Sequence, residues 1–107
     1  MREVKVKKQF LDSLLEIRGY IAQHSPKNAG KFVTDLRPKM DQIIENPETF
    51  SPERNLLTKR RIYRFAIYKK QYKIIFKVLE TQLVFLDIVH GKRHPDYFKG
   101  LRTTDYE

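Results

Sequence analysis

The alternation of apolar and charged residues changes period near the start of the chain. Val4 and Val6 alternate with charged neighbours, which is the period of two expected for a short β-strand. From Lys8 the apolar positions recur at helical spacing, which predicts an amphipathic helix that ends near His24. The predicted buried stripe consists of Phe10, Leu14, Ile17 and Ile21, widened by Leu11 and Leu15.

A second helix is predicted to begin at Ser25-Pro26. Serine is a favourable N-cap, and proline at the first helical position loses no hydrogen bond because that amide has no partner within the helix. Apolar residues continue at helical spacing as far as Glu45, where a following Asn-Pro pair ends the pattern. Pro38 lies inside this pattern, and because the apolar phase continues across it we expect a kink rather than two separate helices.

Three β-strand candidates follow a polar segment with two prolines, residues 47–60, that is typical of a loop. They cover residues 61–68, 72–79 and 82–90 and are rich in β-branched and aromatic residues. The links between them have hairpin length, so we expect antiparallel neighbours. The sequence therefore predicts one α+β domain over residues 1–107, in the order β-α-α-β-β-β, with a small antiparallel sheet and a two-helix layer on one face.

The face of the sheet without helices is expected to be open, and its basic residues are the first candidates for function. In the middle one of the three strands the apolar positions mark the core side, which leaves Lys73 and Lys77 for the exposed side. In the strand before it, the pattern does not decide which side faces the helices. Arg61 and Arg64 lie on opposite sides of that strand, so they are alternative candidates for the open face.

The charge distribution narrows the choice of partner. The chain of 107 residues has 22 Lys or Arg and 13 Asp or Glu, which gives a formal net charge of +9. Nine of the basic residues and no acidic residue lie between Arg54 and Leu79. A basic block of this kind favours a polyanionic partner, either nucleic acid or an acidic protein. A solvated basic face that serves only solubility is the alternative.

Composition excludes several other classes of protein. The chain has no cysteine, which rules out a disulfide framework and thiol catalysis, and its three histidines lack the cysteine partners of a structural zinc site. Carboxylates and histidines are not clustered at metal-ligand spacing, so we expect no metal and no cofactor. No apolar run approaches the roughly 20 residues of a membrane span, and the N-terminal residues lack the apolar core of a signal peptide. We therefore expect a cytoplasmic protein without a membrane partner.

Several segments together resemble the RelE/ParE toxin superfamily, which includes plasmid-stabilisation proteins. They are an initial strand, a Leu/Ile helix that ends in YIAQHSPKNAGKF (residues 20–32), the helix end IIENP (43–47), YKIIFKV (72–78) and LDIVHGKRHP (86–95). The resemblance spans residues 4–97 and rests on the order and spacing of these segments, because each motif alone is degenerate. It implies the toxin half of a type II toxin–antitoxin pair. Its partner would be a small antitoxin, which we expect to be acidic and to fold on binding.

The superfamily implies two mechanisms. RelE-like members resemble ribonucleases that cut mRNA on the ribosome without a metal, whereas ParE-like members inhibit DNA gyrase and have no established catalytic residues. RNA cleavage requires removal of the 2′-OH proton, cations around the phosphorane and a proton for the leaving oxygen. We expect the ribosome-dependent mRNA endoribonuclease. A gyrase inhibitor without catalytic activity and a non-toxic antitoxin-binding relative are the alternatives.

The endoribonuclease interpretation assigns roles to particular residues. Arg61 or Arg64, together with Lys73, would hold the scissile phosphate, and a histidine would act as acid or base. Arg93 would stabilise the phosphorane, and Tyr97 would stack on a base. The full catalytic set is Arg61, Arg64, Lys73, His90, Arg93, His94 and Tyr97. The expected nucleic-acid-binding set is Lys59, Arg60, Lys69, Lys70, Lys77 and Lys92.

Each candidate also has a purely structural explanation. His90 continues an apolar row and can be a hydrogen-bonded core residue, and His94-Pro95 can form a turn. Arg61 and Arg64 can be flanking charges on a strand without a ligand. Tyrosines on strands are more often cross-strand packing partners than stacking platforms. This applies to Tyr63, Tyr68 and Tyr72.

Overall fold

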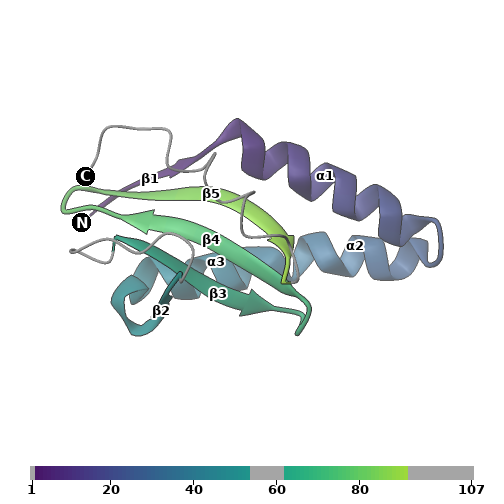
Figure 1. Ribbon diagram of the computed structural model, residues 1–107. Helices are drawn as coiled ribbons and strands as arrows, with labels where there is room; N and C mark the ends of the chain where they lie inside the picture. The colour runs from purple at the N-terminus through teal and green to yellow at the C-terminus, as the bar shows by residue number, and fades with distance from the viewer. Residues whose placement is uncertain (1, 54–61, 92–107) are drawn as a thin grey trace.

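The structure of the protein is a computed structural model that describes residues 2–53 and 62–91 (Figure 1). In these residues three α-helices pack on one face of a five-stranded sheet. The α+β class and the order of the predicted elements are confirmed. In chain order the elements are β1 (Glu3–Val6), α1 (Lys8–Ala22), α2 (Pro26–Thr34), α3 (Leu36–Glu45), the 3-10 helix η1 (Pro47–Thr49), β2 (Ser51–Pro52), β3 (Tyr63–Tyr68), β4 (Tyr72–Val78) and β5 (Gln82–His90).

The sheet is mixed, and this corrects the expectation of a purely antiparallel one. Its strand order is β1-β5-β4-β3-β2, with β3, β4 and β5 antiparallel as predicted. β1 runs parallel to β5; the three α-helices, β2, β3 and β4 all lie between them in the chain, so no tight turn forces the two strands to be antiparallel. β2 lies inside the predicted loop 47–60 and pairs with the start of β3.

The predicted second helix is divided instead of kinked. α2 ends at Thr34 and α3 begins at Leu36, with Asp35 between them still in helical conformation at φ −76° and ψ −14°. Pro38 is the third residue of α3, where its missing N–H would have had no partner within the helix. In a continuous helix that N–H would bond to the carbonyl of Thr34, so the division lies one turn before the proline.

One hydrophobic core lies between the helices and the sheet. Phe10 of α1 and Phe32 of α2 are buried in it, and the Tyr68 hydroxyl of β3 donates a hydrogen bond to the Phe32 carbonyl at 2.6 Å. The widened stripe expected for α1 is wrong, because Leu11 is 49% and Leu15 62% exposed. The other members of this core include Leu36, Ile43, Ala66, Ile74, Phe76, Val78, Leu83, Phe85 and Ile88.

The opposite face of the sheet is buried as well, so the expectation of an open face is wrong. Its cluster contains Tyr63 of β3, Ile75 of β4 and Val84 of β5, which are between 0% and 3% exposed. Ile62, Leu86 and Val89 complete the cluster. Basic side chains on this face of β4 are therefore set among apolar ones.

An irregularity in β5 changes which of its residues face the helices. Ile75 lies opposite Asp87 and Phe76 lies opposite Phe85, so Leu86 has no partner on β4. This β-bulge interrupts the strict alternation. As a result Ile88 packs in the helix-side core, whereas Leu86 belongs to the opposite face.

Candidate functional site

Lys73 and Lys77 of β4 lie on the sheet face away from the helices, as predicted, but neither is freely exposed. The Lys73 ammonium donates to Glu53 Oε2 at 3.2 Å and lies 4.6 Å from the centroid of the Phe65 ring. The expected exposure of Lys77 is wrong. It is 1% exposed, and its ammonium lies 5.8 Å from the Tyr63 ring centroid. Packing on this face of the sheet has removed the surface on which Lys77 was expected to bind nucleic acid.

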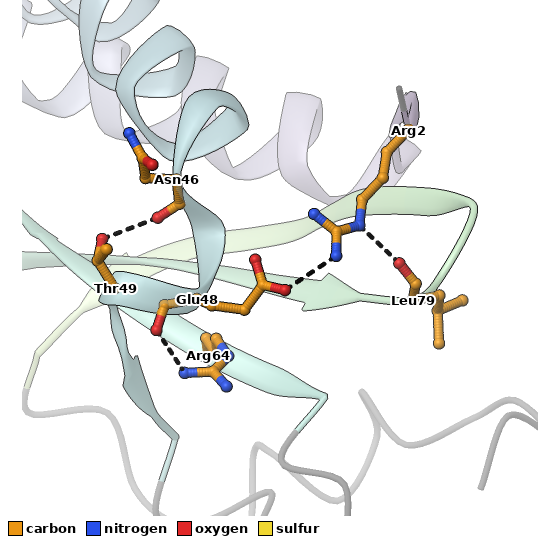
Figure 2. A network of polar contacts seen from close by, with 6 residues as sticks. All are labelled: Arg2, Asn46, Glu48, Thr49, Arg64 and Leu79. Carbon is orange, nitrogen blue, oxygen red and sulfur yellow. Dashed lines mark hydrogen bonds and ion pairs between the residues drawn. The ribbon is translucent and has the colours of Figure 1, made fainter.

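Arg64 lies on the other side of the sheet. It is opposite Phe76 in the register of β3 and β4, so it faces the helices, whereas Lys73 is opposite Ile67. Arg64 Nη1 donates to the Phe50 carbonyl at 2.6 Å and to the Glu48 carbonyl at 3.3 Å. Figure 2 shows the second of these bonds, from Arg64 on β3 to Glu48 in η1. Arg64 and Lys73 therefore cannot hold one phosphate between them.

Near Arg64, a network of polar contacts connects parts of the chain that are far apart in the sequence (Figure 2). Arg2 Nε donates to the Leu79 carbonyl at 2.8 Å, and its Nη2 donates to Glu48 Oε2 at 3.0 Å. The hydrogen bond from Arg2 lowers the pKa of the Glu48 carboxyl. The Thr49 hydroxyl donates to the Asn46 carbonyl at 2.8 Å within the same turn. These contacts tie the N-terminus, η1 and the turn between β4 and β5 together, which is a structural role.

Lys69 and Lys70 form the tip of the hairpin between β3 and β4. Both have positive φ values, 51° and 66°, which is the left-handed conformation that a tight hairpin turn requires. Lys69 Nζ donates to Asp35 Oδ2 at 2.6 Å, and this hydrogen bond lowers the pKa of Asp35. Both lysines are exposed, so the tip presents positive charge to solvent.

A groove of about 790 Å³ separates α1 from the ends of β4 and β5. Tyr20 of α1 and Gln23, the residue that follows this helix, line one wall, and Ile88 lines the sheet side. The rings of Tyr72 and His90 also line it, with their centroids 5.7 Å apart in an edge-to-face arrangement. Burial and, to a smaller extent, Tyr20 raise the pKa of the Tyr72 hydroxyl.

A second hollow of about 480 Å³ adjoins this groove and shares Tyr20 and Tyr72 with it. It extends to Lys31 of α2 and to Lys69 of the hairpin tip. We call this region the helix–hairpin end. Its members are Tyr20, Lys31, Lys69, Lys70, Tyr72 and His90.

The helix–hairpin end contains the accessible members of the candidate set in the described ranges. Lys69 and Lys70 are exposed, and so is His90, which means that the core interpretation of this histidine is wrong. His90 is the last residue of β5, where it lies opposite Tyr72 of β4 and lines the groove. The remaining candidates lie outside the described residues, so their roles stay predictions. They are Lys59, Arg60, Arg61, Lys92, Arg93, His94 and Tyr97.

Sequence reasoning did not single out three residues that shape these surfaces. Tyr20 was seen only as part of a longer motif, and its 62% exposure depends on how α1 meets the sheet. Glu53 lies in a polar segment that gave no sign of burial, although it is 0% exposed. Asp87 did carry a signal, because it is the one acid in the apolar run LVFLDIVH, and it is also 0% exposed.

The described part of the chain has neither a metal-binding cluster of side chains nor a helix that could cross a membrane. Residues 2–53 and 62–91 contain no group of three or more His, Cys, Asp or Glu side chains that could hold a metal ion. No helix in these residues is both long enough and apolar enough to cross a membrane.

The same fold, a sheet with one helical layer, occurs in a solved structure of another chain. A chain of the chromosomal ParDE toxin–antitoxin system of P. aeruginosa superposes with a TM-score of 0.66 at 17% identity, covering 84% of this chain and 96% of that one. At that identity the match shows the fold. The conserved hypothetical protein HP0894 of Helicobacter pylori gives a TM-score of 0.47 at 14% identity, covering 87% of this chain and 98% of that one.

The sequence itself defines the family. The family model described as the ParE toxin of the type II toxin–antitoxin system, parDE, matches residues 4–95. The chain therefore belongs to the ParE toxin family, the toxin components of type II toxin–antitoxin modules, and the predicted resemblance to the RelE/ParE superfamily is confirmed. No curated protein gives a significant match to the chain.

Proposed function

We propose that this toxin acts by binding DNA gyrase, the ParE-type mechanism, and not by cutting RNA. The observation that carries the proposal is the match of the ParE family model to residues 4–95, which is nearly the whole chain. The predicted endoribonuclease is the competing mechanism, and both would arrest growth when the antitoxin is absent.

The geometry of the described candidates favours a binding module. An endoribonuclease needs several cationic and proton-transferring groups within reach of one phosphate. Arg64 and Lys73 lie on opposite faces of the sheet, and each already bonds to protein oxygens. Lys77 is buried. Arg64 and Lys73 therefore do not hold one phosphate together, and Lys77 does not offer an exposed charge to nucleic acid; Arg61, the alternative to Arg64, lies outside the described residues.

We place the gyrase-binding surface at the helix–hairpin end. Protein interfaces are organised around exposed aromatic side chains that become buried in the complex. Tyr20 is 62% exposed and lies between two adjoining hollows. Lys31, Lys69 and Lys70 add exposed positive charge around it, which favours a negatively charged region of the target.

A cognate antitoxin is the second partner of a type II toxin. With a net charge of +9 on this chain, we propose that the antitoxin is acidic and folds as it covers the toxin. Raising the salt concentration to about 0.5 M should then slow association, because screening weakens long-range attraction between unlike charges. An association rate that does not change with salt would show that the charge excess plays no part in pairing.

The mechanism is tested by inducing the chain in cells without its antitoxin. We expect growth arrest, DNA cleaved and covalently linked to gyrase, and intact messenger RNA. Mapping of mRNA 5′ ends provides the control in the same culture. New ends within messages, together with unlinked DNA, would establish the endoribonuclease instead. Normal growth would identify a relative that has lost its toxicity and only binds an antitoxin.

A further inference from the structure

The two edges of the sheet differ in whether they can accept another strand. At one edge, β2 consists of Ser51–Pro52, and a proline has no N–H to donate to a neighbour. At the other edge, β1 has β5 on its inner side and is the last strand that the described residues contribute to the sheet. All four of its residues, Glu3–Val6, are exposed. Figure 1 shows β1 along the upper side of β5, leading directly into α1.

The hydrogen bonds of β1 show which of its amides point outwards. The Glu3 amide donates to the Thr81 carbonyl at 2.9 Å, and the Lys7 amide donates to the Phe85 carbonyl at 2.9 Å. Successive amides of a strand point to opposite sides. The N–H and C=O groups of Val4 and Val6 therefore point away from β5, towards the outer edge.

The side chains of β1 alternate between the two faces of the sheet. Val4 and Val6 lie beside Leu83 and Phe85 in the parallel register, which places them on the helix side of the sheet. They remain 39% and 41% exposed. Glu3 and Lys5 lie on the other side, where Lys5 Nζ is 4.0 Å from Glu3 Oε1.

We infer that β1 is a self-association surface, on which a second copy of this chain adds its own β1 in antiparallel register with Val4 opposite Val4. In this register the two Val4 residues exchange both of their outward main-chain hydrogen bonds. Glu3 of each copy lies opposite Lys5 of the other, so the sequence Glu-Val-Lys is complementary to itself about a twofold axis. The sheet becomes continuous across the two copies.

Edge strands often carry charges that prevent such pairing, and β1 is short. A protective edge has charges of one sign, which repel when the strand meets its own copy. Here the two charges on one side have opposite signs, and the other side has two exposed valines. A shift of the register by two residues would place Lys5 opposite Lys5, so the charges select one register.

The dimer should be weak. A contact of one short strand buries less than the roughly 1,200 Å² of a stable complex, and the net charge of +9 on each copy opposes association. We expect a Kd on the order of 10⁻⁴ M. Sedimentation velocity of the full chain, from about 10 µM to about 1 mM, covers this range.

Charge reversal tests the register. Glu3→Lys and Lys5→Glu should each weaken association about fivefold to tenfold, since either change places like charges opposite each other twice. The double variant E3K/K5E should restore the original affinity. Lys8→Glu is the matched control, because it makes the same charge change as Lys5→Glu one residue into α1 and should not weaken association. Equal effects of Lys5→Glu and Lys8→Glu would overturn the inference.

Val4→Pro tests the strand pairing itself. It removes an outward N–H without removing a bond to β5, so the chain should stay folded, as circular dichroism would verify, and become monomeric. Association that Val4→Pro leaves unchanged would overturn the inference, and so would a wild-type chain that stays monomeric at about 1 mM. A loss of antitoxin binding in Val4→Pro with self-association intact would assign this edge to the antitoxin and would also overturn it.

Discussion

Lys73 and Glu53 form an ion pair across the sheet face that lacks helices, with Nζ 3.2 Å from Oε2 and the carboxylate completely buried. This ion pair changes the role that the basic block between Arg54 and Leu79 was expected to have. Lys73 belongs to that block, and the sequence suggested an exposed phosphate ligand. The structure gives it a carboxylate partner and places its ammonium against the Phe65 ring. The positive charge of Lys73 therefore stabilises the fold and is not held free for a target.

The pair makes Lys73 a stabilising residue. We expect Lys73→Met to lower the free energy of unfolding by about 1–3 kcal/mol, because it removes a charged partner from a buried carboxylate. Urea denaturation at neutral pH provides the measurement. Lys70→Met, at the exposed hairpin tip, should change stability by less than about 0.5 kcal/mol. Wild-type stability in Lys73→Met, accompanied by a loss of RNA cleavage, would instead support the endoribonuclease mechanism.

Tyr68 should couple stability to alkaline pH. Burial, and to a lesser extent the Asp35 carboxylate, raises the pKa of Tyr68 to about 12. The folded chain therefore holds the phenol proton more tightly than the unfolded chain does. This contribution to stability is complete below pH about 10 and is lost as the pH rises towards 12.

Tyr68→Phe provides the matching variant. It should lower stability by about 1 kcal/mol at pH 7, because the Phe32 carbonyl loses its donor. It should also make the decline of stability above pH 10 shallower than in the wild type. Urea denaturation across this pH range measures both effects, with Tyr20→Phe as the exposed control. An equally steep decline in Tyr68→Phe would show that another group causes it.

The hairpin tip is held by Lys69 and Asp35. The hydrogen bond from Lys69 lowers the pKa of the Asp35 carboxyl, so Lys69→Met should raise this pKa towards its ordinary value of 3.8. Carbon-13 NMR of the carboxyl group during an acid titration provides the measurement. Lys70→Met should leave the titration of Asp35 as it is, because Asp35 bonds to Lys69. Identical titrations of the wild type and Lys69→Met would contradict the ion pair.

Charge reversal at the tip should weaken the interaction with gyrase. In K69E/K70E the tip changes sign, and we expect at least tenfold more protein to be needed for half-maximal inhibition of supercoiling, chiefly through slower association. Lys8→Glu together with Lys7→Glu makes the same charge change at the start of α1, away from the helix–hairpin end, and should have a smaller effect. Equal effects of the two double variants would indicate that only net charge matters.

The sequence predicted the helices and strands better than it predicted which strands pair and which face of the sheet each side chain lies on. Strands at 61–68, 72–79 and 82–90 were recognisable because β-branched and aromatic residues are separated there by short links. Periodicity does not specify direction, so the parallel pairing of β1 with β5 could not be predicted. The bulge at Leu86 depends on how β5 lies along β4, and a single residue there reverses the side of everything after it.

The burial of Lys77 could not be predicted from the sequence for a different reason. Lys77 alternates with apolar residues on β4 as an exposed lysine would, and only packing on the second sheet face shows that it is buried. Arg64 was one of two alternatives, and it lies on the helix side because Ala66 and Tyr68, which alternate with it on β3, pack in the core there. The residues of the helix–hairpin end come from α1, α2, the β3–β4 turn, the start of β4 and the end of β5, which no local pattern links.

The mechanism that we propose is binding to DNA gyrase without any chemistry by the toxin. Supercoiling of relaxed plasmid by purified gyrase, titrated with the purified chain, tests it most directly. We expect supercoiling to fall as the chain is added, the cognate antitoxin to reverse the effect, and K69E/K70E to shift the curve to higher concentration. Undiminished supercoiling at a large molar excess of folded, growth-arresting protein would contradict it.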